Sequence, residues 1–225
     1  MTDVNVAYGD LQVLRNVNFD IRNVIRPGLT QGQVECLLAP SGMGKSQLFR
    51  VLAGLKKPDS GTVAFEGKTR EGPGGVGVVA QDYPLFKHLT IWDNLILSAN
   101  LTYKDTSVAK ETVSKYLNQF QLVDKINQYP HQISGGQRQR IAIIQQMLHC
   151  RSLLLMDEPF SGLDPINKKR VQDFIISVTS TDEKMTTIVT THDISSAVAI
   201  ADTIMLLGRE RDVHGNIIPG ANIRF

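Results

Sequence analysis

Hydrophobic and polar residues in the first third of the chain follow the patterns of short β-strands separated by glycines. Val4–Tyr8 and Leu14–Ile21 alternate between apolar and polar positions, as strands with one buried face do. Val34–Leu38 is a short apolar run, which is typical of a fully buried strand. Two further strands are expected at 61–67 and 76–80, each beside glycines. This part of the chain is therefore predicted to be mainly β-structure.

Helical spacing replaces strand patterns in the middle third. Apolar residues recur three and four positions apart over Thr90–Leu101 and again over Val108–Phe120. Thr90 is a suitable N-cap for the first of these helices, with Asp93 as a weak capping-box partner. We therefore expect residues of about 82–133 to form a helical lobe.

From Ser134 onward, expected strands alternate with expected helices. In chain order they are a helix from Ser134, a strand at Leu153–Met156, a helix at Pro165–Thr179, a strand at Thr186–Thr190, a helix at Ile194–Ala201 and a strand at Thr203–Leu207. Such alternation favours right-handed βαβ units and a parallel sheet. We predict one α/β domain with a small antiparallel β portion. Its core would comprise residues 1–81 and 134–225, with the helical lobe inserted.

Composition and charge narrow the class of protein. The 225 residues carry 24 Lys and Arg against 22 Asp and Glu, so electrostatic binding of nucleic acid is not expected. The apolar runs are too short to cross a bilayer, and the N-terminus lacks the regions of a signal peptide. Two cysteines cannot by themselves build a disulfide framework or a full zinc site. These features indicate a soluble protein of a reducing compartment.

A candidate phosphate-binding loop follows the Val34–Leu38 strand and precedes a plausible helix over Ser46–Gly54. Glycines let the backbone approach phosphates closely, and the N-terminus of a helix favours negative charge. Lys45 would reach the β- and γ-phosphates, and the Ser46 hydroxyl would bind Mg²⁺. The candidate nucleotide-binding residues of this segment are Ala39, Pro40, Ser41, Gly42, Met43, Gly44, Lys45, Ser46 and Gln47.

Two positions of this loop depart from the usual pattern. Ala39 stands where glycine is usual, and a positive φ there would cost about 1–2 kcal/mol. Gln47 stands where a second hydroxyl residue is common. The alternative to a phosphate site is a glycine-rich turn with an incidental lysine.

Two carboxylates end the apolar strand at Leu153–Met156. Parallel sheets bind ligands at the carboxyl ends of their strands, which would place Asp157 and Glu158 beside the phosphate loop. Asp157 could hold Mg²⁺, and Glu158 could orient or deprotonate an attacking water. The alternative is a strand that simply ends in a solvated acidic turn.

A second anion-binding segment is expected at Ile133–Gln137, which reads Ile-Ser-Gly-Gly-Gln. Ser134 at a helix start offers a hydroxyl together with free backbone N–H groups. The alternative is an ordinary helix capped by Ser134. One chain does not need two phosphate sites for one nucleotide, but two chains packed head to tail would each complete the site of the other.

These residues together resemble the ATP-binding cassette (ABC) ATPases over nearly the whole chain. The family elements occur in the family's order: Tyr8 at the adenine-stacking aromatic, Ala39–Ser46 at the Walker A loop, Gln81 at the Q-loop, Ile133–Gln137 at the signature, Leu153–Glu158 at Walker B, Ser161–Asp164 at the D-loop and His192 at the switch histidine. The resemblance implies a P-loop NTPase fold with a RecA-like parallel core.

The same resemblance implies an activity and a partner. ATP would close a head-to-tail homodimer and be hydrolysed, coupled to movement of integral membrane permease subunits. The implied residue roles are catalytic for Glu158, His192 and Gln81; nucleotide-binding for Tyr8, the phosphate loop, Ser134, Gly135, Gly136, Gln137 and Asp164; and Mg²⁺-binding for Ser46, Gln81 and Asp157.

Local sequence also resembles bacterial importer subunits, above all those of the nitrate/sulfonate/taurine and polar amino-acid types. The similar segments are Gln81–Asn94, Tyr129–Gly136 and Thr191–Val198. This resemblance implies a peripheral protein at the cytoplasmic face of a bacterial inner or plasma membrane. The alternative is a regulatory or non-transport ABC ATPase without a permease. The candidates for permease contact, which could instead only pack the lobe, are Leu85, Phe86, Leu89 and Trp92.

Three segments depart from the importer pattern. An insertion is expected at 23–30, Ile144-Gln-Gln146 replaces the usual small and basic residues, and the tail 212–225 differs from the common ending. The transported substrate cannot be read from the sequence, because selectivity lies in the partners of a motor subunit.

Overall fold

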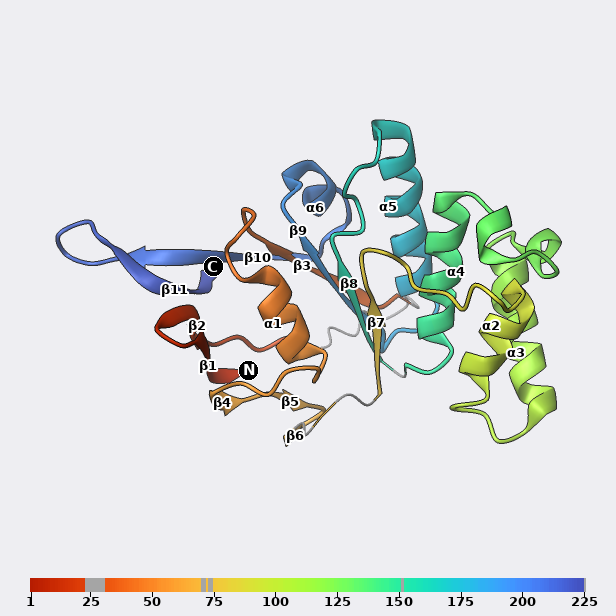
Figure 1. Ribbon diagram of the computed structural model, residues 1–225, viewed down its shortest axis with the longest axis horizontal. Coiled ribbons are helices and arrows are strands. Elements are labelled where there is room, and N and C mark those ends of the chain that lie inside the picture. Colours follow the sequence, from red (N-terminus) through yellow and green to blue (C-terminus); the bar gives the residue numbers. More distant parts are fainter. Residues whose placement is uncertain (23–30, 70–71, 73–74, 151, 225) are drawn as a thin grey trace.

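A computed structural model describes residues 1–22, 31–69, 72, 75–150 and 152–224 of the chain, and a nine-stranded sheet runs through it (Figure 1). The strand order is β4-β1-β2-β11-β10-β3-β9-β8-β7. The strands are β1 (Thr2–Tyr8), β2 (Leu11–Val17), β3 (Gln33–Leu38), β4 (Ser60–Thr62), β7 (Val76–Val79), β8 (Leu153–Asp157), β9 (Thr186–Thr191), β10 (Thr203–Arg211) and β11 (Ile217–Arg224). A separate two-stranded sheet pairs β5 (Ala64–Phe65) with β6 (Lys68–Thr69).

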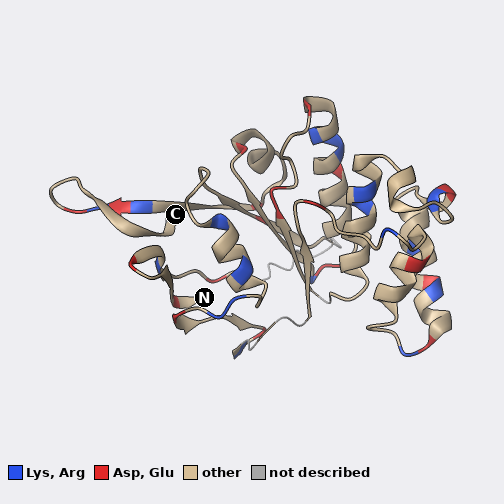
Figure 2. Ribbon diagram, viewed as in Figure 1, with Lys and Arg blue, Asp and Glu red and all other residues tan. Residues whose placement is uncertain are grey.

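Helices cover the sheet (Figure 1). They are α1 (Lys45–Leu52), α2 (Ile91–Ala99), α3 (Thr106–Gln119), α4 (Gly135–Met147), α5 (Pro165–Thr179) and α6 (Ile194–Ile200), with 3₁₀ turns at Val123–Lys125 and Pro130–Gln132. Of these helices, α2 and α3 lie together at one end of the molecule (Figure 1). None of the helices in the described ranges is long and apolar enough to cross a membrane. Figure 2 shows basic and acidic residues interspersed over both the sheet region and the lobe.

The parallel part of the sheet places candidate residues at one edge. β10, β3, β9, β8 and β7 run parallel to one another. Leu38 at the end of β3 lies opposite Thr191 of β9, and Asp157 at the end of β8 lies opposite Thr190. The phosphate loop, the acidic pair and the residues before His192 therefore leave the sheet at neighbouring positions.

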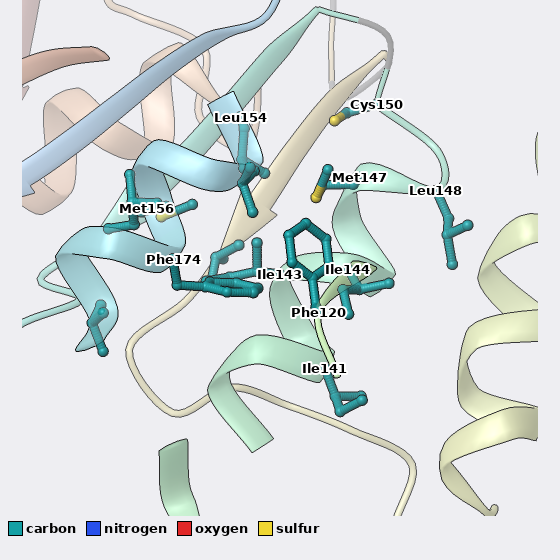
Figure 3. Packing of buried hydrophobic residues seen from close by; sticks show 14 of the residues in the cluster. Phe120, Ile141, Ile143, Ile144, Met147, Leu148, Cys150, Leu154, Met156 and Phe174 are labelled. Carbon is teal, nitrogen blue, oxygen red and sulfur yellow. The ribbon is translucent and has the colours of Figure 1, made fainter. Parts of the chain in front are cut away.

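Strand β8 is apolar throughout because both faces of the sheet are covered. Leu153 and Leu155 face the cluster that includes α1, whereas Leu154 and Met156 face the cluster that includes α4 and α5. Figure 3 shows Leu154 and Met156 in the second cluster. Burial of such side chains contributes about 1.5–3 kcal/mol each.

The helical lobe shares this second cluster with the sheet region. Phe120, which follows α3, packs edge to face on Phe174 of α5, with the ring centroids 4.7 Å apart (Figure 3). The same cluster contains apolar residues of α2, such as Leu95, beside Ile144 of α4. The boundaries of the lobe and the core remain a prediction, but their hydrophobic residues form one continuous cluster.

Several local expectations can be compared with the structure. Thr90 caps α2, accepting from the backbone N–H of Asp93 and donating to its carboxylate, as predicted. The strand expected at 61–67 is instead split into β4 and β5 beside Gly61, whose φ is +86°. The strand expected over Leu14–Ile21 ends at Val17.

The C-terminal segment contains a strand that its sequence pattern did not reveal. β11 forms an antiparallel hairpin with β10 and also pairs with β2 at Ala221 and Leu14. Both strands belong to the nine-stranded sheet, and the turn that joins them projects at the end of the molecule opposite α2 and α3 (Figure 1). The insertion expected at 23–30 lies outside the described residues.

Candidate functional site

The phosphate loop joins β3 to α1 through two glycines in left-handed backbone conformations. Gly42 has φ +81°, and Gly44, the N-cap of α1, has φ +88°. A Cβ at Gly44 would also lie 3.0 Å from Val13 Cγ1 and 3.1 Å from Leu14 Cδ2. Gly44 is therefore required both by its backbone conformation and by its close neighbours.

Ala39 fits the first position of the loop without strain. It is not among the residues with positive φ, so the 1–2 kcal/mol penalty considered from the sequence does not arise. Its side chain is buried in the cluster beside α1. Its N–H donates to the carbonyl oxygen of Thr191 (3.1 Å), which joins the start of the loop to the end of β9.

Lys45, Glu158 and His192 meet at the carboxyl end of the sheet. Lys45 Nζ lies 3.1 Å from Glu158 Oε1, and His192 Nδ1 lies 2.9 Å from Glu158 Oε2. Lys45 Nζ also donates to the carbonyl oxygens of Ala39 (2.6 Å) and Pro40 (3.3 Å). The Lys45 and Glu158 side chains are only 8% and 15% exposed. Glu158 therefore bridges the loop lysine and the histidine.

The backbone of Glu158 adopts a conformation that is rare for a residue with a side chain. Its φ is +49°, and such strain clusters at functional sites. Its N–H donates to Thr190 O (3.0 Å), which fixes the turn after β8. The strained turn directs the Glu158 carboxylate back toward the phosphate loop.

Asp157 is held by a residue that sequence reasoning did not assign to the site. The Thr190 hydroxyl donates to Asp157 Oδ1 at 2.5 Å. Thr190 is fully buried in β9, and its only sequence signal was its position two residues before His192. Asp157 itself is half-buried.

Tyr8 lies beside the first turn of α1. Its hydroxyl donates to Gln47 Oε1 (2.7 Å), and Lys56 Nζ lies 3.9 Å from the centroid of its ring. The Tyr8 residue is 49% exposed, which leaves apolar ring surface open to solvent. Gln47, an unexpected residue at its position, thus ties the tyrosine to the phosphate loop.

Two predicted magnesium-binding residues are exposed. Ser46 lies in the first turn of α1, next to Lys45. Gln81 follows β7 by two residues, and within the described ranges it makes no hydrogen bond to the other candidate site residues. The structure therefore places Ser46 at the loop, whereas the side chain of Gln81 makes no hydrogen bond to the loop within the described ranges.

The signature segment forms a capped helix start apart from the phosphate loop. Ser134 Oγ accepts from Gln137 N (3.2 Å), and Gln137 Oε1 accepts from Ser134 N (2.9 Å), so the capping alternative holds within one chain. The segment lines a cavity of about 940 Å³ with the end of α3 and part of α5. Lys45, Glu158 and His192 do not line that cavity.

Neither backbone conformation nor packing within the described chain requires glycine at Gly135 or Gly136. Neither has a positive φ, and a Cβ at either position would meet nothing within 4 Å. Nearby, Arg138 Nε is buried without a hydrogen-bond partner among the described residues. The start of α4 therefore has open space at both glycines and a buried donor nearby without a partner among the described residues.

Asp164 of the D-loop caps α5. Its Oδ1 accepts from the N–H groups of Ile166 and Asn167, both at 3.0 Å. Hydrogen bonds from the backbone and side chain of Asn167 hold the pKa of Asp164 below its usual range. Asp164 is exposed, so its capping role leaves it accessible.

The candidate residues for permease contact differ in their exposure. Phe86 is 48% exposed, whereas Leu85 and Trp92 are partly buried and pack against the hydrophobic cluster of the lobe. Asn94 is fully buried and binds the backbone of the loop that presents Phe86, including Phe86 N (2.8 Å) and Leu89 O (3.2 Å). Phe86 is thus the best placed of the four for an external contact.

One departure from the importer pattern has a structural explanation. Gln146 Oε1 accepts from the N–H of Val78 (3.0 Å) on β7. Because β7 is the last strand of the sheet, this N–H has no strand partner on its outer side. Gln146 therefore joins α4 to the edge of the sheet and lies outside the candidate site.

Comparison with known proteins identifies the family. The model of the family described as ABC transporter matches residues 22–161, more than half of the chain. A probable sulfate/thiosulfate import ATP-binding protein of Chlorella vulgaris is 37% identical over 213 residues, covering 91% of this chain and 85% of that protein. A sulfate/thiosulfate import ATP-binding protein of Pectobacterium atrosepticum is 35% identical over 92% of this chain, which spans only 62% of the relative's length.

Solved structures share the fold. CbiO1 from Clostridium perfringens, part of an ABC transporter complex, matches with a TM-score of 0.82 at 23% identity, over 100% of this chain and 85% of that one. A dimer of the ATP-binding cassette MJ0796 bound to ADP and Pi matches with a TM-score of 0.74 at 25% identity, over 91% and 92% of the two chains. The predicted P-loop α/β fold is thereby confirmed. The family match and the curated relatives show that this protein belongs to the ABC transporter family, as an ATP-binding subunit.

Proposed function

We propose that the chain is the ATP-hydrolysing motor subunit of an ABC importer and works as a head-to-tail homodimer bound to membrane permease subunits. The observation that carries this proposal is the meeting of Lys45, Glu158 and His192 beside the phosphate loop. A cation for phosphate, a carboxylate for water and an imidazole at the same sheet edge are the groups that phosphoryl transfer to water requires.

The loop and Tyr8 suit a nucleoside triphosphate. Gly42 and Gly44 allow close approach of phosphates to the backbone at the start of α1, and a Cβ at Gly42 would meet no atom within 4 Å. Lys45 would exchange its contact with Glu158 for the β- and γ-phosphates. The exposed ring of Tyr8 beside the loop would stack on adenine.

The donor set at the sheet edge fits Mg²⁺ held jointly with phosphates. Ser46, Gln81 and Asp157 offer oxygen ligands, which this hard cation prefers. The described residues contain no group of three or more His, Cys, Asp or Glu side chains that could hold a metal ion. When bound, Mg²⁺ would neutralise charge on the β- and γ-phosphates.

Glu158 and His192 would act on the attacking water. Once Lys45 turns to phosphate, one Glu158 oxygen becomes free to orient the water or accept its proton. The bond from His192 Nδ1 would hold the other oxygen in place, leaving the second ring nitrogen for the γ-phosphate. Thr190 would meanwhile keep Asp157 turned toward the metal position.

A second copy of the chain would complete each site. The open surfaces of Gly135 and Gly136 support close approach of another molecule at the start of α4, as does Arg138 Nε, which has no hydrogen-bond partner in the described part of the chain. The nucleotide would then lie between the Lys45 loop of one chain and Ser134–Gln137 and Asp164 of the other. Hydrolysis would reopen the dimer and release the permease helices to swing back.

The names of the curated relatives support an import role at a membrane. They are sulfate/thiosulfate import ATP-binding proteins, and we place this chain likewise as a peripheral subunit at the cytoplasmic face of a membrane. Phe86, the most exposed of the four lobe candidates, is the first residue to test for permease contact. The cargo would be selected by the partners.

The test is gel filtration of Glu158→Gln with and without ATP. The substitution removes the water-activating carboxylate, so ATP should bind, persist and convert monomer to dimer while turnover falls at least about 100-fold. Lys45→Ala in the same background is the control and should remain monomeric. Unchanged turnover in Glu158→Gln would refute the role of Glu158, and absence of ATP binding would refute the phosphate site.

A further inference from the structure

We propose that Lys168 is a positioning residue for hydrolysis, acting through Asp193 to hold His192 against Glu158. Lys168 Nζ lies 2.5 Å from Asp193 Oδ2, and the two side chains are 32% and 14% exposed. Asp193 directly follows His192 in the chain, so its placement determines where the histidine backbone lies. The inference rests on the function proposed above.

Asp193 organises the turn between β9 and α6. Its N–H donates to Thr191 Oγ1 (3.0 Å), and its Oδ1 accepts from the Ser195 hydroxyl (2.6 Å) and from Ser196 N (3.2 Å). Its Oδ2 accepts from the Ser196 hydroxyl (3.0 Å) as well as from Lys168. Every contact except that of Lys168 is local in sequence, so Lys168 alone among these donors ties the turn to another helix.

His192 depends on that turn because its ring has little other support. The side chain is 52% exposed, and its ring bond to Glu158 is the contact that orients it. The ion pair of Lys168 with Asp193 lowers the pKa of this aspartate below its usual range, and the Ser195 hydroxyl adds to the effect. The carboxylate therefore remains charged, and the pair intact, throughout the neutral range.

Lys168 also connects this turn to the D-loop. It lies in the first turn of α5, where its N–H donates to Asp164 O (2.9 Å). One turn further along, Gln172 Nε2 donates to the Ser196 hydroxyl (3.1 Å) at a fully buried position. The contacts form a continuous path from Asp164 through Lys168 and Asp193 to His192 and Glu158. In the proposed dimer, the start of this path faces the other chain.

Three substitutions test the proposal. Lys168→Met keeps the apolar stem but removes the charge, Lys168→Arg restores a cation, and Lys169→Met is the matched control on the adjacent, 67% exposed residue, which pairs with Asp173. We expect Lys168→Met to lower kcat for ATP hydrolysis roughly 10-fold with KM for ATP within about twofold, since misplacement of a group away from the chemistry acts on the reacting geometry. Lys168→Arg should recover most of the rate, and Lys169→Met should match the wild type.

A second readout does not require hydrolysis. In the nucleotide-free protein, the ring resonance of His192, assigned with His192→Gln, should shift in Lys168→Met and stay in place in the arginine and Lys169 variants. The two readouts keep this inference distinct from the proposed function. A chain that bound ATP without hydrolysing it would overturn the proposed function. The His192 ring resonance would still show whether Lys168 acts on His192 through Asp193.

Four outcomes would overturn the role of Lys168. One is a Lys168→Met enzyme as fast as Lys169→Met, and another is an arginine variant as slow as the methionine variant. The third is a rate loss caused only by unfolding. Lys168→Met would then have a lowered melting temperature but a normal rate of hydrolysis at temperatures below it. An unmoved His192 resonance in Lys168→Met would count equally against it.

Discussion

At the scale of single residues, Lys45 and His192 both contact Glu158 in a way that bound phosphates and a metal ion would change. Lys45 and Glu158 pair with each other in a place where both side chains are nearly buried. An unpaired charge at such a place would be costly, so each of the two side chains needs a partner of opposite charge there. Phosphates and a metal ion would replace this mutual contact by new partners for each residue. The strained backbone of Glu158 fits such a dual role, because it holds the carboxylate within reach of both Lys45 and His192.

The contact between Tyr8 and Gln47 leads to a prediction at the same scale. Tyr8→Phe keeps the ring but loses the 2.7 Å hydrogen bond, so ATP affinity should fall by about two- to fivefold, as loss of one exposed neutral bond does. Tyr8→Ala removes stacking as well and should cost roughly tenfold or more. Calorimetry with ATP and with tripolyphosphate measures both effects. Tripolyphosphate has no base, so an equal loss for both ligands in Tyr8→Ala would contradict the stacking role of Tyr8.

At the scale of elements, the edge of the sheet depends on helix α4. Gln146 supplies the partner of Val78 N–H on the outermost strand. At Gly77 on the same strand, an added Cβ would lie 2.8 Å from Leu154 Cδ1 and 3.1 Å from Cys150 Cβ. The close packing of β7 and the bond from Gln146 together fix the strand that leads to Gln81. The unusual glutamine therefore supports the approach to the site without entering it.

Replacement of Gln146 tests this structural role. Gln146→Leu leaves Val78 N–H without its partner at a half-buried position, so the free energy of unfolding should fall by about 1–2 kcal/mol. Urea denaturation measures the change, and Gln119→Leu on the exposed surface of α3 is the control. ATP affinity of the folded Gln146→Leu protein should stay near the wild-type value. A large loss of affinity without a loss of stability would instead assign Gln146 to the site.

Local sequence predicted most elements because their signals are local. The pattern at Pro165–Thr179 gave the bounds of α5, and the Thr90 and Ser134 caps gave the starts of α2 and α4. β11 was missed because Pro219 and Gly220 interrupt its apolar residues, so that the segment becomes a strand only through pairing with β10 and β2. The contacts of Thr190 and Lys168 were missed for a similar reason. Each joins residues more than 20 positions apart, and no spacing along the chain reveals such pairs.

At the scale of the whole molecule, the two proposed anion-binding segments, the phosphate loop and Ser134–Gln137, lie apart within one chain. A second copy of the chain would explain this separation. The cavity beside Ser134–Gln137 is lined by α3, α4 and α5, whereas the phosphate loop leaves the sheet beside β9. Neither segment alone provides donors on both sides of a triphosphate. A head-to-tail dimer would bring one of each to every nucleotide, and its symmetry would make the two sites equivalent.

Gly136 allows the dimer to be tested without disturbing the single chain. Gly136→Leu adds a side chain into open space on a helix, so the monomer should keep its melting temperature or gain slightly, by up to about 1 kcal/mol of helix propensity. In the Glu158→Gln background the same substitution should abolish the ATP-dependent dimer in gel filtration, because the added side chain would occupy the place of the partner's nucleotide. Lys110→Leu, exposed on α3, should dimerise normally. A Gly136→Leu protein that still dimerised with ATP would show that the start of α4 is not where the two chains meet.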